Sequence, residues 1–368
     1  MKNHISLFIF AIALLSGPVS ANDLSMTAVK DTLASIPGEH NYIYVRTPLG
    51  EDEEKNYDEI TFYDGLGREL DFAQSYGADR AGAIMAHHHL IEYDSLGRKE
   101  KQWLSTNTSF SYMSPEDLKG GVLWDYHDAG KRSYLQTNYE SSPLNRITEQ
   151  YGVGDAWGDH PARMEYLTNI PADSLRCSFY FIDDNDSLIR RGDYRSGELQ
   201  VTKATDEDGK PTYTFVDKQG RTLLTRLGRG NQQADTYFVF DRFGRIRYVL
   251  PPMINDEISA GNLDLYAYQY LYDSFGRCIS KKLPGCAAIG YVYDKADRVI
   301  LSQNGNQSQK KEWTFTFYDN QGRLALTGLC SFNDPPSLDN SIVRAYRTTS
   351  EKDGVLHSGY EVELSIYF

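Results

Sequence analysis

One short motif recurs along the chain and constrains its fold more than any other feature of the sequence. The motif reads aromatic, Asp, any two residues, Gly, Arg. Strict copies occupy residues 63–68, 93–98, 240–245, 272–277 and 318–323. Recurrence on this scale indicates a repeat architecture, in which each repeat is one supersecondary unit that stacks on its neighbours.

The spacing within the motif predicts a β-hairpin turn. Asp is favoured at the first position of a type I turn, where its carboxylate accepts a backbone N–H two residues later. Gly three residues after Asp suits the left-handed backbone that follows such a turn in a bulged hairpin. The aromatic residue then ends one strand and the Arg begins the next, where its guanidinium can lie toward the Asp or over an aromatic ring.

Degenerate copies of the motif follow the same turn chemistry. Residues 293–298 carry Asp297 in place of Gly, and residues 142–146 carry Ser in place of Asp and Asn145 in place of Gly. Asn and Asp are the residues other than Gly that best tolerate positive φ. Residues 217–221 keep Asp, Gly and Arg and lack only the adjacent aromatic residue. Substitutions that obey turn chemistry indicate a structural motif.

We therefore predict structural roles, and no catalytic role, for the Asp, Gly and Arg residues of the repeat. So many similar turns cannot all be active sites. The predicted turn residues are Asp64, Gly67, Arg68, Asp94, Gly97, Arg98, Asp217, Gly220, Arg221, Asp241, Gly244, Arg245, Asp273, Gly276, Arg277, Asp294, Arg298, Asp319, Gly322 and Arg323.

The segments beside the turns have the composition of strands. Residues 212–216, 236–240, 266–272 and 313–318 are β-branched and aromatic, mostly with alternation of period two. The chain also holds 27 Tyr and 30 Gly, which favour strands and tight turns over long helices. We predict an all-β fold of antiparallel hairpins that form one curved or spiralling sheet, with a short helix starting at Ser114.

The N-terminus has the features of a signal peptide. Lys2 precedes an apolar run over residues 5–15, which is too short to span a bilayer, and Ala21 ends a small-residue cleavage site. A buried N-terminal helix is the alternative. We expect export to the periplasm, the cell surface or the extracellular space, with a mature chain that begins near Asn22. No later apolar run is long enough to cross a membrane.

The net charge and the absence of common enzyme motifs argue against some classes of function. The formal net charge is -13, which argues against a nucleic-acid binder because such proteins usually carry a basic face. The sequence contains neither a Gly-x-Ser-x-Gly elbow nor a phosphate-binding P-loop. We expect no enzymatic activity and no cofactor. Trp103, Trp124 and Trp157 could stack on sugars, and core packing is the simpler role for them.

Four cysteines and several polar clusters are the remaining candidates for a site. Export would allow Cys177, Cys278, Cys286 and Cys330 to pair in any of three connectivities, or to stay as free thiols. The histidines at 87–89 could ligate a metal, but a third ligand at a suitable spacing is absent and a solvated strand is the simpler interpretation. Residues 183–186 and 206–209 lack the spacing of a calcium loop and are predicted to be acidic hairpin turns. We predict no metal site.

These motifs together resemble a known family. The repeats resemble the YD repeats of bacterial rearrangement-hotspot (RHS) proteins. A second segment is similar to the domain of unknown function that precedes YD repeats in secreted RHS-like proteins of gut-type bacteria. The residues that carry this second resemblance are Ser142–Arg146, Glu149, Gln150, Gly152, Gly154, Ala156, Trp157, His160, Arg163–Tyr166, Thr168 and Asn169.

The resemblance implies a division of the chain and a function. Residues 1–21 would be the signal peptide, 22–170 an RHS-associated β-rich domain with two YD hairpins, and 171–368 a YD-repeat sheet that is truncated at its C-terminus. RHS proteins wind such hairpins into a shell around a C-terminal toxin or effector, in interbacterial competition or host interaction. We expect a secreted, non-enzymatic structural module of an RHS-like shell. The alternative is a surface adhesin or glycan-binding β-protein.

The family's C-terminal features lead to an expectation about partners. Its paired Asp-Pro-x-Gly self-cleavage motifs are absent, since Pro336 follows Asp334-Pro335. We expect either a downstream shell and effector segment or a separate partner chain. The aromatic strands at residues 313–318 and 360–367 contain neither Pro nor Lys, so an unpaired edge there would favour self-association.

Overall fold

A computed structural model describes residues 41–48, 56–78, 84–127, 130–228, 233–254, 256–319, 321–331, 341–352 and 355–366. The expected signal peptide over residues 1–21 and the expected break over 333–340 lie outside these ranges.

The described residues are mostly antiparallel β-sheet, which confirms the all-β prediction. Within these ranges, 20 strands belong to one sheet. In chain order the strands are β1 (Asn41–Pro48), β2 (Asn56–Tyr63), β3 (Glu69–Ala78), β4 (Ile84–Tyr93), β5 (Lys99–Trp103), β6 (Thr106–Ser109), β7 (Tyr134–Tyr139), β8 (Ile147–Tyr151), β9 (Ala162–Thr168), β10 (Ser178–Ile182), β11 (Leu188–Asp193), β12 (Gln200–Thr205), β13 (Pro211–Val216), β14 (Thr222–Leu227), β15 (Ala234–Phe240), β16 (Ile246–Leu250), β17 (Tyr268–Tyr272), β18 (Cys278–Lys282), β19 (Ile289–Tyr293), β20 (Val299–Gln303), β21 (Glu312–Tyr318), β22 (Leu324–Ser331), β23 (Ser341–Lys352) and β24 (Val355–Ile366). The α-helices are α2 (Pro115–Asp125), α3 (Ala260–Tyr266) and α4 (Gly305–Lys310).

The chain divides into two compact units. The first comprises Met1–Glu165 and Ala204–Lys210, and the second comprises Tyr166–Lys203 and Pro211–Phe368. The sequence places its division at residue 170, which stays a prediction about domains.

The first unit is built from hairpins that pair in succession. Strand β2 pairs with β1 and β3, and β4 pairs with β3, β5 and β6, all antiparallel. Alternate residues of β4 are buried, as period-two side-chain geometry requires. Its core contains Ile60, Phe62, Ala73, Ala86 and Phe110.

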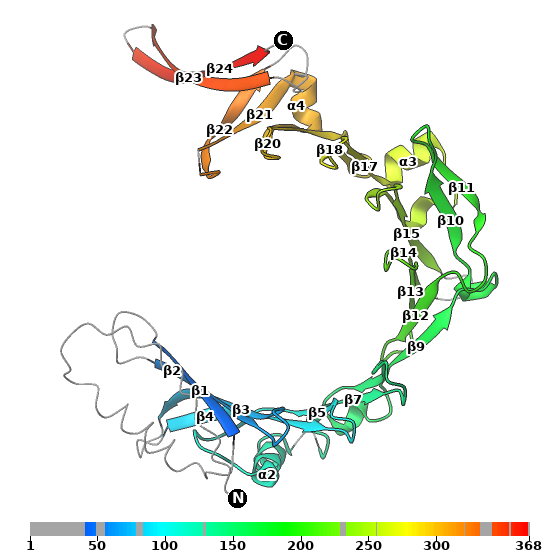
Figure 1. Ribbon diagram of the computed structural model, residues 1–368, viewed down its shortest axis with the longest axis vertical. Helices are drawn as coiled ribbons and strands as arrows, with labels where there is room; N and C mark the ends of the chain where they lie inside the picture. The colour runs from blue at the N-terminus through cyan, green and yellow to red at the C-terminus, as the bar shows by residue number, and fades with distance from the viewer. Residues whose placement is uncertain are drawn as a thin grey trace, which may run out of the picture. The chain divides into compact units, whose positions relative to one another are not determined.

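Helix α2 belongs to this first unit and begins where the sequence predicted a helix. The Ser114 side chain accepts a hydrogen bond from the Asp117 backbone N–H, and Pro115 occupies the first turn. Leu118 and Val122 are buried. The helix contacts β4 and β6, and Figure 1 shows it beside the strands of this unit.

The second unit continues the hairpin pattern and adds a second layer. Its strands β13 to β22 pair antiparallel, each with the next. The hairpin of β10 and β11 forms its own two-stranded sheet and packs beside β15 (Figure 1). The core between these layers includes Tyr180, Leu199, Phe215, Leu224 and Tyr237.

A smaller core and a separate hairpin complete the second unit. Leu301, Trp313 and Phe315 form the smaller core. Strands β23 and β24 pair only with each other among the described strands.

One predicted strand is partly wrong. The aromatic run over residues 266–272 was expected to be extended throughout, but Tyr266 ends helix α3 and only Tyr268–Tyr272 form a strand. Ser259 caps the helix by accepting from the Asn262 backbone N–H. This local cap outweighs the β-propensity of the run at its first residue.

The turns have the backbone geometry that the motif predicts. Every glycine of the strict copies has positive φ: Gly67 79°, Gly97 81°, Gly244 80°, Gly276 87° and Gly322 79°. The degenerate copies behave alike, with φ 54° at Asn145 and 60° at Asp297. A register shift occurs at the aromatic residue, as between Val239 and Phe240, so these are bulged hairpins.

Replacing Gly244 with Val should lower the free energy of unfolding by about 1–3 kcal/mol, because a β-branched residue is strained at positive φ. Replacement with Asn should cost less. The site isolates backbone strain, since a new Cβ would meet only Arg221 Nη1 at 3.8 Å. Gly97 is the matched position, where a Cβ would lie 2.8 Å from Arg68 Nη1 and an added clash is expected. Urea unfolding checks this, and equal tolerance of Val and Asn at both sites would refute the turn assignment.

Candidate functional site

Each Asp-x-x-Gly-Arg turn is a closed hydrogen-bonded unit, as the Asp241 turn illustrates. Gly244 N–H donates to the Asp241 carbonyl at 3.0 Å. Asp241 Oδ1 accepts from the backbone N–H groups of Phe243 and Arg245, each at 2.9 Å, and Oδ2 accepts from Arg245 Nε at 2.7 Å. Burial of Asp241 opposes its ionisation, but the Arg245 and Phe243 hydrogen bonds outweigh that effect and lower the pKa of the carboxyl.

A second set of contacts joins the Asp241 turn to the turn that follows it. The guanidinium of Arg245 lies over the Tyr272 ring, 4.7 Å from its centroid, and donates to the Asp273 carbonyl at 3.3 Å. In return, the Tyr272 hydroxyl donates to the Ile246 carbonyl at 2.9 Å. We call this set the turn-to-turn clamp: the Arg covers the next aromatic ring, whose hydroxyl binds the carbonyl that follows the Arg.

The turn-to-turn clamp recurs in both units. Its Arg–Tyr pairs are Arg68–Tyr93, Arg98–Tyr139, Arg245–Tyr272, Arg277–Tyr293 and Arg298–Tyr318. The hydroxyls of these tyrosines donate in order to the carbonyls of Glu69, Lys99, Ile246, Cys278 and Val299. At Phe240 the cation–π contact with Arg221 remains, but the ring has no hydroxyl to donate. The motif residues therefore set the spacing between hairpins as well as the turns themselves.

Tyr272→Phe should lower the free energy of unfolding of the second unit by about 1 kcal/mol, the net value of one hydrogen bond. The ring and its contact with Arg245 stay. Phe240→Tyr is the reverse change, placing a hydroxyl where the clamp lacks one, and should be neutral or stabilising. Chemical denaturation of both variants measures the effect. Equal stability of Tyr272→Phe and the parent would show that the hydroxyl contributes nothing.

The three consecutive histidines of β4 do not form the solvated strand that the sequence suggested. His88 is 1% exposed. Its Nδ1 lies 2.7 Å from Asp71 Oδ2, and its Nε2 lies 3.0 Å from the Ser109 carbonyl. Both ring nitrogens thus lie within hydrogen-bond distance of an oxygen atom. His87 stacks on Tyr76, with ring centroids 4.3 Å apart.

The acidic clusters and the cysteines were the other candidates for a site. Asp183 and Asp206 begin hairpin turns, with Asp183 N–H donating to the Ser187 carbonyl and Asp206 N–H to the Lys210 carbonyl, as predicted. The four cysteines are free thiols. Cys177 is buried, and burial raises the pKa of its thiol to about 12. Among the described residues, no group of three or more His, Cys, Asp or Glu is placed to hold a metal ion.

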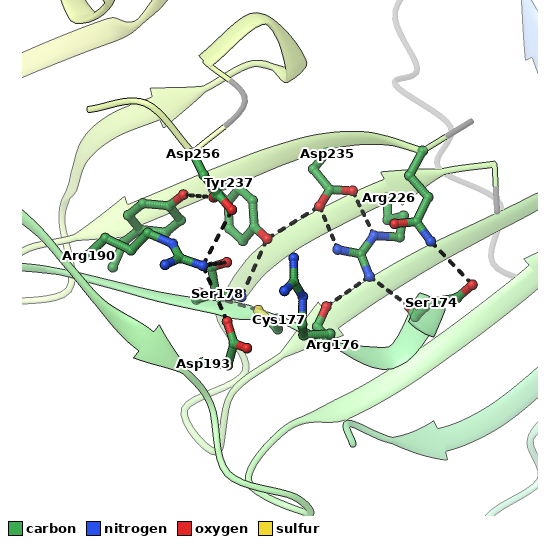
Figure 2. A network of polar contacts seen from close by, with 12 residues as sticks. Ser174, Arg176, Cys177, Ser178, Arg190, Asp193, Arg226, Asp235, Tyr237 and Asp256 are labelled. Atoms are coloured by element: carbon green, nitrogen blue, oxygen red, sulfur yellow. Dashed lines mark hydrogen bonds and ion pairs between the residues drawn. The ribbon is translucent and has the colours of Figure 1, made fainter. Parts of the chain in front are cut away.

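Sequence reasoning missed a polar network inside the second unit, shown in Figure 2. Arg226 on β14 is 2% exposed and lies opposite Asp235 on β15. Its Nε and Nη2 donate to the Asp235 carboxylate at 2.7 and 2.5 Å. Its Nη1 donates to the carbonyls of Ser174 and Arg176 at 2.9 and 2.8 Å. Arg226 therefore fixes the segment that leads into β10 against the main sheet.

Two tyrosines extend this network toward β10 and β11. The Tyr237 hydroxyl donates to Asp235 at 3.3 Å and accepts from the Ser178 backbone N–H at 3.4 Å. Burial raises the pKa of Tyr237 to about 12. The Tyr180 hydroxyl donates to Asp256. Burial and this contact raise the pKa of Tyr180.

Arg190 on β11 links the acidic groups of the network. It lies 3.4 Å from Asp256 and 3.5 Å from Asp193, and it donates to Ser178 Oγ at 3.1 Å. Its Nε is buried and has no hydrogen-bond partner among the residues that the structure describes. The network thus alternates cations and carboxylates across the interface of the β10–β11 hairpin with β14 and β15.

A cavity of about 170 Å³ opens beside this network. Arg176, Arg226, Gln233, Asp235 and Asp256 supply its polar wall. Tyr180, Tyr237, Leu250, Pro251, Pro252 and Ile254 supply its aromatic and apolar wall. None of these residues belongs to the repeated turns. One sequence signal could have revealed this network. Arg226 lies two residues after Leu224 in β14, so the two side chains share the buried face of the strand, where a charged residue is rare.

Comparison with known protein families gives a match for part of the chain. Residues 41–168 match a domain of unknown function, DUF6443. No curated protein matches the chain. Among the described residues, none of the helices has the length and apolar character needed to cross a bilayer.

Solved structures share the fold at low sequence identity. The crystal structure of TcdB2-TccC3-Cdc42 superposes with a TM-score of 0.53 at 14% identity over 84% of this chain. That of TcdB2-TccC3 gives 0.52 at 13% identity over 84%. In both cases the match spans 14% of the other chain. These likenesses show that the chain has the fold of a small part of a much larger protein.

Proposed function

We propose that the chain is a secreted, non-enzymatic structural module of an RHS-like shell. The observation that carries the proposal is the turn-to-turn clamp, which joins successive hairpins by the same contacts in both units. An arrangement of this kind extends by adding hairpins, because each new aromatic-Asp turn meets the Arg of the turn before it. The likeness to part of TcdB2-TccC3 supports the same role.

The role in toxin or effector encapsulation or delivery also belongs to this proposal. An Asp and Arg of each turn are engaged with each other and with backbone, so they are not poised to act on a substrate. A structural wall needs such saturated groups. We expect the partner to be a further polypeptide segment that bears the same repeat, whether in the same chain or a separate one.

Cross-linking in the producing bacterium tests this proposal. The full chain, tagged and isolated under native conditions, should cross-link to polypeptide that carries aromatic-Asp-x-x-Gly-Arg repeats, identified by mass spectrometry. The Tyr272→Phe and Arg245→Ala variants, which weaken the clamp, should reduce that yield together with hairpin protection from proteolysis. Partners that all lack the repeat would contradict the shell role.

A glycan-binding adhesin is the second candidate, and one observation favours it. Trp124 at the end of α2 is 83% exposed. Exposed aromatic rings can stack on sugars. A glycan array with the parent and Trp124→Ala separates the candidates: binding that the substitution abolishes supports an adhesin, and an array without signal supports the shell module.

Export is part of the proposal and has its own expected result. Cells that produce the full chain should translocate a species whose first residue lies near Asn22. N-terminal sequencing of the protein outside the cytoplasm measures this. Intact Met1 on that stable exported species would contradict cleavage.

A further inference from the structure

Three neighbouring turns of the first unit each carry a leucine at the tip. These leucines are Leu66, Leu96 and Leu144, which are 80%, 66% and 69% exposed. The turns are neighbours because their strands pair in the order β2, β3, β4, β5, β7 and β8. Successive tips are therefore two strands apart, about 10 Å in a sheet. We call these three leucines the tip row.

The turn itself does not need an apolar residue at this position. Gln219, Ala296 and Gln321 occupy the same place in three turns of the second unit. Their backbone N–H groups donate to the first Asp of the turn at 2.9 Å, as that of Leu96 does. Single exposed leucines are ordinary on a protein surface, whereas a regular row of them is typical of an interaction surface.

The tip row is electrically neutral, although the whole chain has a formal net charge of -13. None of residues 65–67, 95–97 and 143–145 is charged. The charged residues that flank them form ion pairs, Arg68 with Asp64, Arg98 with Asp94, and Arg146 with Glu140. A high net charge keeps copies of a protein apart. At the tip row two copies can meet without bringing unpaired like charges together.

The corresponding turns of the second unit are charged. Phe243 and Phe275 are their exposed apolar tips, at 67% and 78%. Lys218 and Arg242 are exposed in the turns at 217–221 and 241–245, and each gives its turn two positive residues against one negative residue. A contact of this row with its own copy would bring like charges together, which is costly. Charge therefore favours the first unit for a contact between two copies.

We propose that the tip row binds the tip row of a second copy of this chain, across a two-fold axis. A row that runs in the opposite direction has its leucines at the same spacing, so the two rows match along their whole length. The turn at 93–98 then lies at the axis, and Leu66 of each copy lies beside Leu144 of the other. A two-fold contact uses the same patch on both copies and is closed.

The turns are prepared for this contact, and its size sets its strength. The backbone N–H groups of Leu66 and Leu96 are bound to Asp64 and Asp94 at 2.8 and 2.9 Å, so little backbone freedom is lost on binding. Three leucines in each copy form a small apolar core. We therefore expect a weak dimer, near the lower limit of specific interfaces at about 1,200 Å². The dimer does not depend on the shell role.

Sedimentation equilibrium of the full exported chain tests the proposal. The parent should dimerise at micromolar concentration, and the triple variant Leu66→Ser, Leu96→Ser, Leu144→Ser should dimerise at least about tenfold more weakly. Phe243→Ser with Phe275→Ser is the matched control, which removes exposed tips of the second unit and should change nothing. Circular dichroism verifies folding. A monomeric parent at high micromolar concentration would overturn the proposal, even if it bound phosphatidylcholine vesicles, and so would equal association of the triple variant and the parent.

Disulfide trapping tests the two-fold arrangement. Ser95 is exposed beside Leu96 in the central turn, so Ser95→Cys should place two thiols near each other at the axis. Cys286, which is exposed, is changed to Ser in the background. Mild air oxidation should give a covalent dimer from Ser95→Cys and much less from Lys218→Cys, the matched position in the second unit. Equal yields from the two positions would overturn the proposed contact.

Discussion

Replacing Arg226 with Met should lower the free energy of unfolding of the second unit by about 3–5 kcal/mol. The substitution leaves the Asp235 carboxylate inside the network without its bidentate partner. It also removes the donor to the carbonyls of Ser174 and Arg176, which then lie beside the core without compensation. Differential scanning calorimetry and urea unfolding measure the loss.

Two controls show whether the lost pair explains this effect. Arg176→Met changes a cation that makes no ion pair with the residues drawn in Figure 2, and it should cost little. The double variant Arg226→Met with Asp235→Leu removes both charges and should recover part of the stability, because replacing a whole buried pair by apolar groups is often neutral. If Arg226→Met is as stable as the parent, the hairpin of β10 and β11 does not depend on this arginine.

The second large effect is expected in the first unit. His88→Leu should cost about 3–5 kcal/mol, because it leaves the Asp71 carboxylate buried and uncompensated. The Asp71 side chain is 5% exposed, and within the described part of the chain its Oδ1 has no hydrogen-bond partner. Leucine fills a similar space within the core, so the loss reports the missing contact with Asp71 rather than a cavity. Urea unfolding of the parent and variant measures it.

The neighbouring histidine provides the matched comparison. His87→Leu alters the opposite face of the same strand, where the ring stacks on the exposed Tyr76, and should cost much less. Combining His88→Leu with Asp71→Leu should restore much of the stability. Should His87→Leu and His88→Leu prove equally mild, the buried pair contributes little to the fold.

The sequence predicted the turns well because their chemistry is local. Asp241, Gly244 and Arg245 interact within five residues, and the positive φ of Gly244 follows from the type of turn. Strand predictions beside those turns succeeded for the same reason. The prediction for residues 266–272 was too long because a capped helix, set by Ser259, reaches Tyr266.

The sequence predicted that the Arg of the repeat would lie either toward the Asp of its turn or over an aromatic ring. In the structure the guanidinium does both. Arg245 binds Asp241 in its own turn and covers Tyr272 in the next. Sequence could name the residue types that attract a guanidinium. It could not choose the ring, because that depends on which strands become neighbours.

By itself, therefore, the sequence determined the repeat, the hairpin turns and the antiparallel β class, since each follows from contacts between residues close in the chain. The tertiary structure alone decided the burial of His88 against Asp71 and the network around Arg226. Arg226 meets the Ser174 carbonyl across 52 positions and Asp235 on the neighbouring strand. Whether such a charge is buried or solvated depends on how distant strands and the β10–β11 hairpin pack, and no local propensity records that packing.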